Sequence, residues 1–382
     1  MKVLLSAGMI QGGRSGVGRY VIALSEAMVR EQAAVDLFVA GLDADRALFP
    51  WIGDERWVSI PASMSGGAAN LWWHQTGINR ITKKLAIDLV HIPSYRRMIW
   101  NCAVPQVATI HDCAPFILRD KYDFLRGFFG RVMVPMLARR VRRVIAVSET
   151  TGRDVVRWMK VPASKVTVIP NGIDHRMFFP PAAADIADFR QRMNLPQPFF
   201  LYVARLEHPA KNHLRLIRAF EQVVKAGAFD GQLVLPGAPW HGSEVVTRAV
   251  ADSPCRERIR LEGFVDNADL PLWYAAAEAL VFPSLMEGFG LPLLEAQACG
   301  TRIACADATS LPEVAGPAGL LFDGLDELSI AAAMTRLATM DAAERQRREN
   351  EGKAWAARFT WSAHAAAAVR IYQETRGTAT GS

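Results

Sequence analysis

Two glutamates flank a predicted helix start in the segment Glu287-Gly288-Phe289-Gly290-Leu291-Pro292-Leu293-Leu294-Glu295. The segment follows an apolar run at 279–282 that is typical of a buried strand, and Pro292 suits a first helical turn. Glycines let a ligand approach the backbone, and N–H groups at a helix start attract a diphosphate. Because carboxylates accept hydrogen bonds from hydroxyl groups, Glu287 and Glu295 indicate a site for a sugar and a ribose. The alternative is a strand–loop–helix whose glutamates face solvent.

Two cations follow another predicted strand, at 199–203. Arg205 comes directly after it, and Lys211 lies just before a predicted helix at 213–226. A guanidinium fork and an ammonium point charge at the carboxyl end of a strand are well suited to stabilise a departing diphosphate. The alternative is a surface loop that carries both charges without a ligand.

Two motifs in the first half also follow predicted strands. The run Gly12-Gly13-Arg14-Ser15-Gly16-Val17-Gly18 opens a helix and is typical of a phosphate cradle, although its spacing is not that of a dinucleotide-binding loop. His111-Asp112 directly follows a strand at 106–110, where catalytic groups collect in parallel sheets. The alternatives are a plain tight turn for the first motif and a capping Asp beside a buried His for the second.

The elements that must position these residues alternate between short apolar runs and longer helical patterns. Continuous apolar runs favour parallel strands that are covered on both faces. Alternation that restarts midway predicts two doubly wound α/β units. The predicted strands are 3–7, 35–39, 89–92, 106–110, 144–147 and 166–169 in the first half, and 199–203, 232–235, 259–262, 279–282 and 302–304 in the second.

A domain boundary is predicted at Pro170-Asn171-Gly172-Ile173-Asp174, where turn residues close a strand and a Pro/Ala-rich stretch follows. We therefore predict an N-terminal domain over 1–175 and a C-terminal domain over 176–360. Open parallel sheets bind ligands beyond the carboxyl ends of their strands. Two such sheets facing each other would place the active site in the cleft between them.

Composition bounds the class of protein. The chain has 382 residues, of which 51% are hydrophobic and 21% charged, as in an ordinary globular protein. No run approaches the length of a membrane span, and the N-terminal apolar run is too short for a signal peptide. The five Cys are scattered, without a CxxC pair, which predicts neither a zinc site nor a disulfide framework.

The charge is unevenly spread. Residues 1–170 carry 23 Lys+Arg and 13 Asp+Glu, a balance of +10, whereas the rest carries 21 and 25, a balance of −4. Anionic membrane, lipid phosphate or nucleic acid would each explain a basic first half. No nucleic-acid recognition module is present, so we expect no nucleic-acid partner.

Together these motifs resemble family 4 of the retaining glycosyltransferases, which have the GT-B architecture of two facing Rossmann-like domains. The resemblance covers essentially the whole chain. Its matching segments, in order, are the Gly-rich first loop, His111-Asp112, Val147-Ser148-Glu149, 168–174, Arg205 with Lys211, Gly263-Phe264-Val265, Glu287 seven residues before Glu295 in the order Glu-x7-Glu, and Phe359-Thr360-Trp361. Pro209-Ala210 and Leu235-Pro236-Gly237 depart from the usual loops without removing the charges.

The resemblance implies a role for each position. Glu287 is expected to hold the transferred sugar, Arg205 and Lys211 the diphosphate, and His111 to line the sugar and acceptor pocket; these four are the expected catalytic residues. It also implies that the C-terminal helix, 361–382, packs back on the N-terminal domain. No cofactor or metal is expected beyond a nucleoside-diphosphate sugar donor. The expected donor-binding residues are Gly16, Gly263, Phe264, Val265, Gly288, Phe289, Gly290, Leu291 and Glu295, with 263–265 near the base and Glu295 on the ribose.

A basic stretch between 119 and 143 indicates the acceptor side. Arginines there interleave with apolar residues, a pattern that suits the surface of an anionic membrane. The alternative is a buried helix whose arginines face water. We expect an enzyme of the cytoplasm, peripheral on the inner face of the cytoplasmic membrane, acting on a glycan or a polyprenyl-diphosphate-linked acceptor. The residues concerned are Arg119, Lys121, Arg126, Arg131, Arg139, Arg140, Arg142 and Arg143, with Phe124, Leu125, Phe128, Phe129, Val132, Met133 and Met136.

Within the family, the sequence is most similar to bacterial mannosyl- and rhamnosyl-type enzymes that build surface polysaccharides. The sequence leaves the donor base, the sugar, the acceptor and the linkage open. Two alternatives also stay open: a sugar-nucleotide epimerase of the same fold, for which Glu287 is the one candidate acid–base carboxylate, and a non-catalytic sugar-nucleotide-binding protein.

Overall fold

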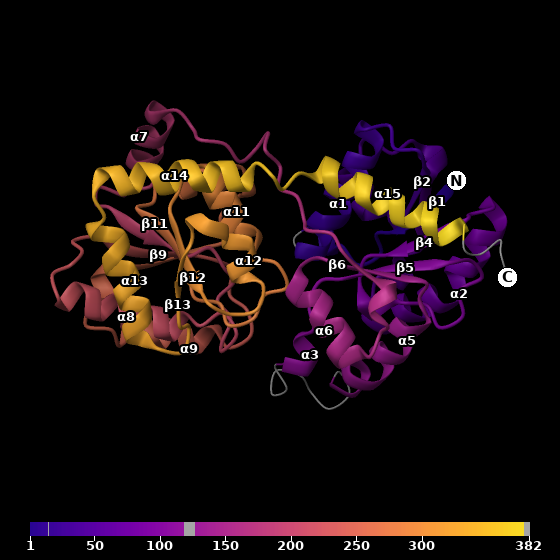
Figure 1. Cartoon of the computed structure of the whole chain (residues 1–382), viewed down its shortest axis with the longest axis horizontal. Helices are drawn as coiled ribbons and strands as arrows, with labels where there is room; N and C mark the ends of the chain where they lie inside the picture. The colour runs from indigo at the N-terminus through magenta and orange to yellow at the C-terminus, as the bar shows by residue number, and fades with distance from the viewer. Residues whose placement is uncertain (14, 118–126, 378–382) are drawn as a thin grey trace. The chain divides into compact units, whose positions relative to one another are not determined.

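The computed structural model describes residues 1–13, 15–117 and 127–377. The chain divides into two compact units (Figure 1). The first unit contains Met1–Gly172 together with the C-terminal residues from Thr360, and the second contains Ile173–Phe359. Arg119, Lys121, Phe124, Leu125 and Arg126 of the basic stretch, and Arg14 of the Gly-rich loop, lie outside the described residues.

The first unit is built on a seven-stranded sheet with the order β3-β2-β1-β4-β5-β6-β7, and every described pair of neighbours is parallel. Its central strands are almost wholly buried, because helices cover both faces and apolar runs remove both from water. The strands are β1 (Lys2–Ser6), β2 (Asp36–Leu42), β3 (Trp57–Ile60), β4 (Leu89–Ile92), β5 (Gln106–Ile110), β6 (Arg143–Ala146) and β7 (Val166–Val168).

Serine caps start two helices of this unit. Ser15 Oγ accepts a hydrogen bond from the Gly18 N–H at 3.0 Å, and Ser148 Oγ accepts one from the Thr151 N–H at 3.0 Å. Each cap satisfies a backbone donor that the first helical turn cannot pair. The helices are α1 (Gly16–Arg30), α2 (Gly67–Leu85), α3 (Ala114–Ile117), a π-helical turn (Phe129–Met133), α5 (Val134–Arg140), α6 (Glu149–Met159) and α15 (Trp361–Gly377).

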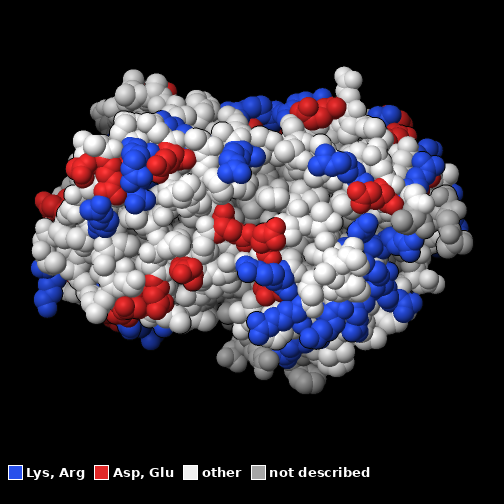
Figure 2. Space-filling view, in the orientation of Figure 1, with Lys and Arg blue, Asp and Glu red and all other residues white. Residues whose placement is uncertain are grey.

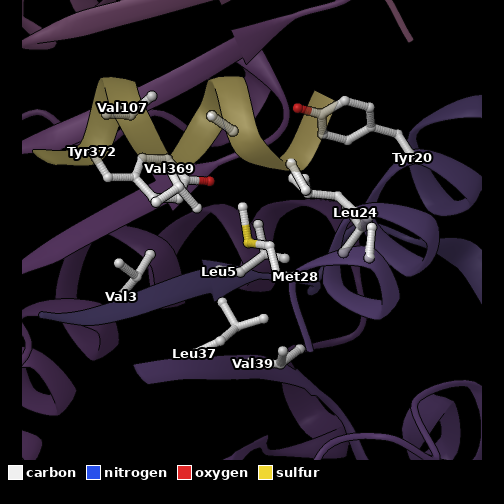
Figure 3. Packing of buried hydrophobic residues seen from close by; sticks show 14 of the residues in the cluster. Val3, Leu5, Tyr20, Leu24, Met28, Leu37, Val39, Val107, Val369 and Tyr372 are labelled. Carbon is white, nitrogen blue, oxygen red and sulfur yellow. The ribbon is translucent and has the colours of Figure 1, made fainter. Parts of the chain in front are cut away.

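The C-terminal helix α15 shares a core with α1 and the sheet, although more than 300 residues separate α15 from α1 along the chain. Figure 3 shows Val369 and Tyr372 of α15 among Leu24 and Met28 of α1 and the inward side chains of β1 and β2. Burying each aliphatic side chain of this kind contributes about 1.5–3 kcal/mol relative to leaving it exposed. The first unit therefore depends on both ends of the chain.

The second unit is built on a six-stranded sheet with the order β10-β9-β8-β11-β12-β13, again parallel throughout the described pairs. The two parallel α/β sheets confirm the predicted fold class. The strands are β8 (Phe199–Leu201), β9 (Gln232–Pro236), β10 (Ile259–Gly263), β11 (Ala279–Phe282), β12 (Ile303–Ala306) and β13 (Leu320–Phe322). The helices are α7 (Ala183–Arg192), α8 (His213–Lys225), α9 (Ser243–Ala251), α10 (Leu270–Ala276), α11 (Leu291–Ala298), α12 (Leu311–Ala315), α13 (Glu327–Thr339) and α14 (Ala342–Ala356).

Two strands, β3 and β13, were not predicted from the sequence. Both lie at a sheet edge, where a strand pairs on one side only. Leu321 in β13 is 48% exposed, and Ser59 in β3 is exposed as well. Edge strands are short and partly exposed, so they lack the long apolar run by which the central strands were recognised.

A predicted strand end also differs. Regular sheet geometry of β8 stops at Leu201, two residues earlier than predicted. Main-chain pairing with the next strand nevertheless continues, since the N–H groups of Tyr202 and Ala204 donate to the carbonyl oxygens of Val234 and Pro236, each at 3.1 Å. In the described part of the chain, no helix is long and apolar enough to cross a bilayer.

A buried chain of hydrogen bonds ties α15 to the sheet of the first unit. The contacts run from Pro170 O to His364 Nδ1 (2.8 Å), from His364 Nε2 to Tyr20 Oη (3.0 Å), and from Tyr20 Oη to Thr109 Oγ1 (3.0 Å). They continue from Thr109 Oγ1 to His91 Nε2 (2.8 Å) and from His91 Nδ1 to Tyr372 Oη (2.7 Å).

The donor of each hydrogen bond in this series can be assigned by starting from the Pro170 carbonyl. The Pro170 carbonyl only accepts, so His364 carries its proton on Nδ1, and its neutral Nε2 accepts from the Tyr20 hydroxyl. Thr109 must then donate to Tyr20, His91 Nε2–H to Thr109, and Tyr372 to His91 Nδ1. With both histidines neutral, every donor in the chain therefore meets an acceptor.

Burial keeps these histidines neutral. Desolvation lowers the pKa of His364 to about 4 and that of His91 to about 3, and it lowers the pKa of His74 and His111 in the same unit to about 4. Burial also raises the pKa of Tyr20 well above its ordinary value, which keeps its hydroxyl protonated as a donor.

We expect the first unit to lose stability as the pH falls below 6.5, the ordinary pKa of histidine. Below pH 6.5 these histidines bind protons in the unfolded chain, but in the folded state His364 binds its proton only near pH 4. Protonation therefore favours the unfolded chain. At pH 5 each such histidine costs on the order of 1–2 kcal/mol. The stability is fully present above pH 6.5 and declines between pH 6.5 and 4.

The exchange His364→Gln removes one titrating group but keeps a donor and an acceptor. It should flatten the pH dependence of the free energy of unfolding by up to about 1.4 kcal/mol per pH unit between pH 6.5 and 5. Urea denaturation of both proteins at several pH values measures this slope, and a comparison at pH 8 isolates the packing cost of the exchange. An unchanged slope would show that His364 does not resist protonation in the folded state.

Candidate active site

The loop between β11 and α11 carries Glu287, and α11 itself carries Glu295. Gly290 ends the loop with φ +105°, a left-handed conformation that favours glycine, and an added Cβ would lie 2.9 Å from Leu311. No side chain caps the start of α11, and Pro292 stands in its first turn. The left-handed conformation of Gly290, rather than a capping side chain, therefore sets how the chain enters α11. Gly288, Phe289 and Leu291 line the same turn.

Glu287 is fixed at three atoms. Its Oε1 pairs with Lys211 Nζ at 2.5 Å, and the two side chains are 17% and 18% exposed. Its N–H donates to Thr309 Oγ1 at 3.1 Å, and its carbonyl accepts from Ser310 Oγ at 3.1 Å. The structure thus brings together Lys211 and Glu287, two predicted site residues that are 76 positions apart.

Glu295 lies one turn inside α11 and is 4% exposed. Its Oε2 accepts a hydrogen bond from the Tyr274 hydroxyl of α10 at 2.8 Å. Glu295 is thus held by a separate partner from Glu287 and is more deeply buried.

Arg205 lies beyond β8, with its side chain 51% exposed. Its Nη2 is 3.4 Å from an oxygen of Glu207, whose side chain is only 2% exposed. Its guanidinium carbon is 4.6 Å from the centre of the Trp240 ring. Behind Lys211, His213 is buried, and burial followed by the Lys211 charge lowers its pKa to about 4, so it adds no positive charge there.

The segment 263–265 begins at the last residue of β10. Gly263 has φ +75°, open space surrounds the position of an added Cβ, and its carbonyl accepts from the Gly237 N–H at 2.6 Å. Phe264 is 70% exposed and Val265 is half-buried. These residues, like Arg205 and Glu287, follow the carboxyl ends of parallel strands, the edge at which open α/β sheets bind ligands.

Gly16 and His111 belong to the first unit. Gly16 opens α1, is exposed, and has open space around the position of an added Cβ. His111 follows β5, and its Nε2 lies 3.0 Å from the Pro93 carbonyl. Since that carbonyl only accepts, Nε2 carries the proton and Nδ1 of the neutral ring is an acceptor. The Tyr20 ring packs edge-on against His111, with centroids 4.8 Å apart.

The four arginines of the basic stretch lie in different settings. Arg139 and Arg140 end α5 and are exposed, and Arg140 stacks over Trp100 at 4.5 Å. Arg142 is exposed, whereas Arg143 starts β6, is half-buried, and donates to the Ser164 carbonyl at 2.6 Å. Arg143 therefore makes a hydrogen bond within the unit and does not simply face solvent.

Five residues of this region were not predicted from the sequence: Glu207, Trp240, Tyr274, Thr309 and Ser310. Thr309-Ser310 lies just before Leu311-Pro312, a helix-start pattern from which a loop at this position could have been predicted. Trp240 and Tyr274 carry no local signal, because their contacts with Arg205 and Glu295 join segments that are distant in the sequence, whereas Glu207 lies only two residues from Arg205.

Known sequence families match both units of the chain. Glycosyltransferase Family 4 matches residues 14–176, and Glycosyl transferases group 1 matches residues 197–340. A D-inositol 3-phosphate glycosyltransferase of Xylanimonas cellulosilytica is 30% identical, over 95% of this chain and 92% of that protein. This chain belongs to glycosyltransferase family 4.

Further relatives of this family 4 glycosyltransferase support the assignment. The O-antigen chain mannosyltransferase B of Escherichia coli is 26% identical over 98% of this chain and all of that protein. Among solved structures, a sucrose-phosphate synthase of Thermosynechococcus elongatus has a TM-score of 0.80 at 22% identity, over 99% of this chain and 100% of that one. Anabaena Alr3699/HepE in complex with UDP-glucose has a TM-score of 0.72 at 18% identity, and the match covers both chains completely. These similarities confirm the GT-B fold.

We expect Lys211 and Glu287 to be energetically coupled in the ligand-free protein. Each single exchange, Lys211→Met or Glu287→Gln, leaves a half-buried charge without this partner. The double variant should therefore be more stable than the sum of the single effects by about 1 kcal/mol or more.

Urea denaturation of all four proteins measures this coupling. A matched control is the pair Arg218–Glu327, at 3.0 Å but with side chains 60% and 31% exposed. Its coupling should stay below about 0.5 kcal/mol because water screens it. Equal coupling in the two pairs would contradict the importance of burial at Glu287.

Proposed function

We propose that this family 4 enzyme is a retaining hexosyltransferase that moves a sugar, with mannose or rhamnose type favoured, from a nucleoside-diphosphate sugar to a glycan or lipid-linked acceptor. The observation that carries the proposal is the contact between Lys211 and Glu287, with Arg205 following a neighbouring strand. A cation for the leaving group and a carboxylate for sugar hydroxyls stand side by side there.

The donor is held by residues of the second unit in this proposal. Arg205, Lys211 and the start of α11 bind the diphosphate, the last through backbone N–H groups. Glu287 accepts hydrogen bonds from the transferred sugar. Glu295 binds the ribose, and residues 263–265 lie along the base. The contact with Glu287 Oε1 holds the Lys211 ammonium group beside the carboxylate that is assigned to the sugar.

Catalysis follows from the charge that develops on the departing diphosphate. As the glycosidic bond breaks, negative charge grows on the β-phosphate, and fixed cations stabilise the transition state more than the ground state. No divalent metal is needed for this role. From the first unit we assign the Gly16 backbone to the donor phosphates, and His111 Nδ1, which is an acceptor in the neutral ring, to a sugar or acceptor hydroxyl.

Surface polysaccharide assembly, as in lipopolysaccharide biosynthesis, is the proposed setting. The support is the similarity to O-antigen chain mannosyltransferase B over the whole length of both chains. The complex of Alr3699/HepE with UDP-glucose supports a nucleotide-sugar donor for this fold.

Release of nucleoside diphosphate tests the proposed reaction. Purified protein is first screened with UDP-, GDP- and dTDP-sugars for thermal stabilisation, because a ligand of the folded state raises the melting temperature. The stabilising donor is then incubated with candidate acceptors in EDTA. We expect acceptor-dependent release of the diphosphate that survives chelation. Interconversion of the donor sugar without release would show an epimerase, and stabilisation without any turnover would show a binding protein.

We expect Arg205→Ala and Lys211→Ala each to slow turnover by roughly 10²–10³, because one charge-assisted partner of the leaving group supplies about 2–4 kcal/mol in the transition state. The acceptor KM should change far less. Steady-state kinetics with folding checked by circular dichroism measures both constants. Near-wild-type turnover in both variants would show that Arg205 and Lys211 do not stabilise the leaving group. The exposed Arg218→Ala is the matched control.

We further propose that the first unit binds the inner face of the cytoplasmic membrane. Figure 2 shows Lys and Arg side chains gathered over the side of this unit where α5 and α6 lie. Exposed cations there include Arg139, Arg140 and Arg142. Apolar side chains are exposed nearby in the sequence: Phe128 by 49% and Val132 by 40%. Cations beside exposed apolar groups suit an anionic headgroup boundary.

We expect flotation of the protein with anionic vesicles at low salt and release at high salt, because salt screens the attraction. Exchange of Arg139, Arg140 and Arg142 for Ser should weaken binding, at about 1 kcal/mol per cation. Arg143 is left in place because of its structural bond. The matched control exchanges Lys225, Arg248 and Arg256, which are exposed on the second unit. Absence of flotation at low salt would favour an acceptor that is free in solution.

A further inference from the structure

Two loops of the second unit run side by side beyond the ends of β8 and β9. The Leu206 N–H donates to the Ala238 carbonyl at 3.0 Å, and the Trp240 N–H donates to the Leu206 carbonyl at 3.1 Å. The His208 N–H then donates to the His241 carbonyl at 3.1 Å. The segments 204–208 and 236–241 therefore extend the parallel pairing of the sheet past its regular strands.

Close packing fixes the distance between these loops. An added Cβ at Gly237 would lie 1.8 Å from the Ala204 carbonyl oxygen, so only glycine allows this approach. Leu206 is 4% exposed and anchors its loop in the core. Alternation along an extended segment then turns Arg205 and Glu207 to the face opposite Leu206.

Trp240 lies against Arg205 on this outer face. The indole is 53% exposed, an uncommon setting for the largest apolar side chain. Its ring centre is 4.6 Å from the Arg205 guanidinium carbon, within the range of a cation–π contact. The Trp240 N–H is hydrogen-bonded to the carbonyl of Leu206, the residue that follows Arg205. The backbone therefore keeps the indole ring and the guanidinium close together.

Glu207 restrains the same guanidinium differently. Its carboxylate is 2% exposed and lies 3.4 Å from Arg205 Nη2, longer than a good charge-assisted hydrogen bond. This contact holds the guanidinium at a single nitrogen. The Trp240 ring adds a second contact at its face, where a planar guanidinium packs favourably.

We propose that Trp240 is a positioning residue for Arg205, holding the guanidinium in the orientation that meets the departing diphosphate. This assignment rests on the proposed function of Arg205. It concerns a residue that contributes no charge of its own and lies outside the motifs that carry the sequence resemblance. The stack fixes the cation before the donor binds, so that little side-chain freedom is lost in the transition state.

Three variants test the assignment. Trp240→Phe keeps an aromatic face, Trp240→Leu keeps apolar bulk without one, and Trp72→Leu removes another exposed tryptophan, in the first unit, as the matched control. We expect Trp240→Leu to lower kcat roughly 3- to 30-fold, the range of a cation–π contact, with a smaller change in the donor KM. Trp240→Phe should retain most of the activity, and Trp72→Leu should match the wild type.

The pairing itself has a readout that does not need turnover. The Arg205 side-chain N–H resonance, assigned by its loss in Arg205→Lys, should be shifted by the indole ring current and should move on Trp240→Leu but not on Trp72→Leu. An unshifted resonance would overturn the stacking whatever the enzyme does.

A double variant distinguishes the positioning role of Trp240 from the proposed role of Arg205. In an Arg205→Ala background, Trp240→Leu should lower kcat no further, because the group that it positions is gone. An equal loss in both backgrounds would show that Trp240 contacts the donor directly and would overturn the positioning role. Near-wild-type turnover of Arg205→Ala alone would overturn the proposed role of Arg205, while the resonance shift would still report the stack.

Discussion

Parallel pairing of strands that are buried on both faces is the constraint on which the rest of the structure depends. Such strands are mostly apolar along their length, so charged residues follow their ends, and the carboxyl ends of all strands in a sheet lie along one edge. Helix starts lie at the same edge and add partial positive charge. Arg205, Lys211 and Glu287 are thereby gathered on one edge of the second sheet, although no local sequence signal links them.

Burial governs how charge is used in both units. In the second, Lys211 and Glu287 are half-buried and neutralise each other, so neither carries an uncompensated charge out of water. In the first, the same cost is avoided by neutrality: His91 and His364 stay unprotonated inside a hydrogen-bonded chain with two tyrosines. That chain joins the C-terminal helix to the strand that precedes His111. The setting of His111 thus depends on residues from the far end of the sequence.

Much of the fold was predictable from the sequence because the central strands are continuous apolar runs. β4, β5 and β11 lie where the pattern predicted them, and the two-sheet class follows from their alternation with helices. The edge strands β3 and β13 were missed for the opposite reason, since partial exposure dilutes their apolar character. The charged residues at strand ends, such as Arg205 and Glu287, were likewise visible, because they directly follow apolar runs in the sequence.

The sequence by itself determined the family, the α/β class and the residues worth assigning to a donor site, since periodicity and local motifs are short-range properties. Only the tertiary structure decided which side chains these residues contact. That Lys211 pairs with Glu287, that Tyr274 holds Glu295, and that Trp240 lies over Arg205 could not be foreseen, because each contact joins loops or helices that are distant in the sequence. The register of a sheet and the distance between its loops, here set by Gly237 against Ala204, arise only when the whole sheet packs.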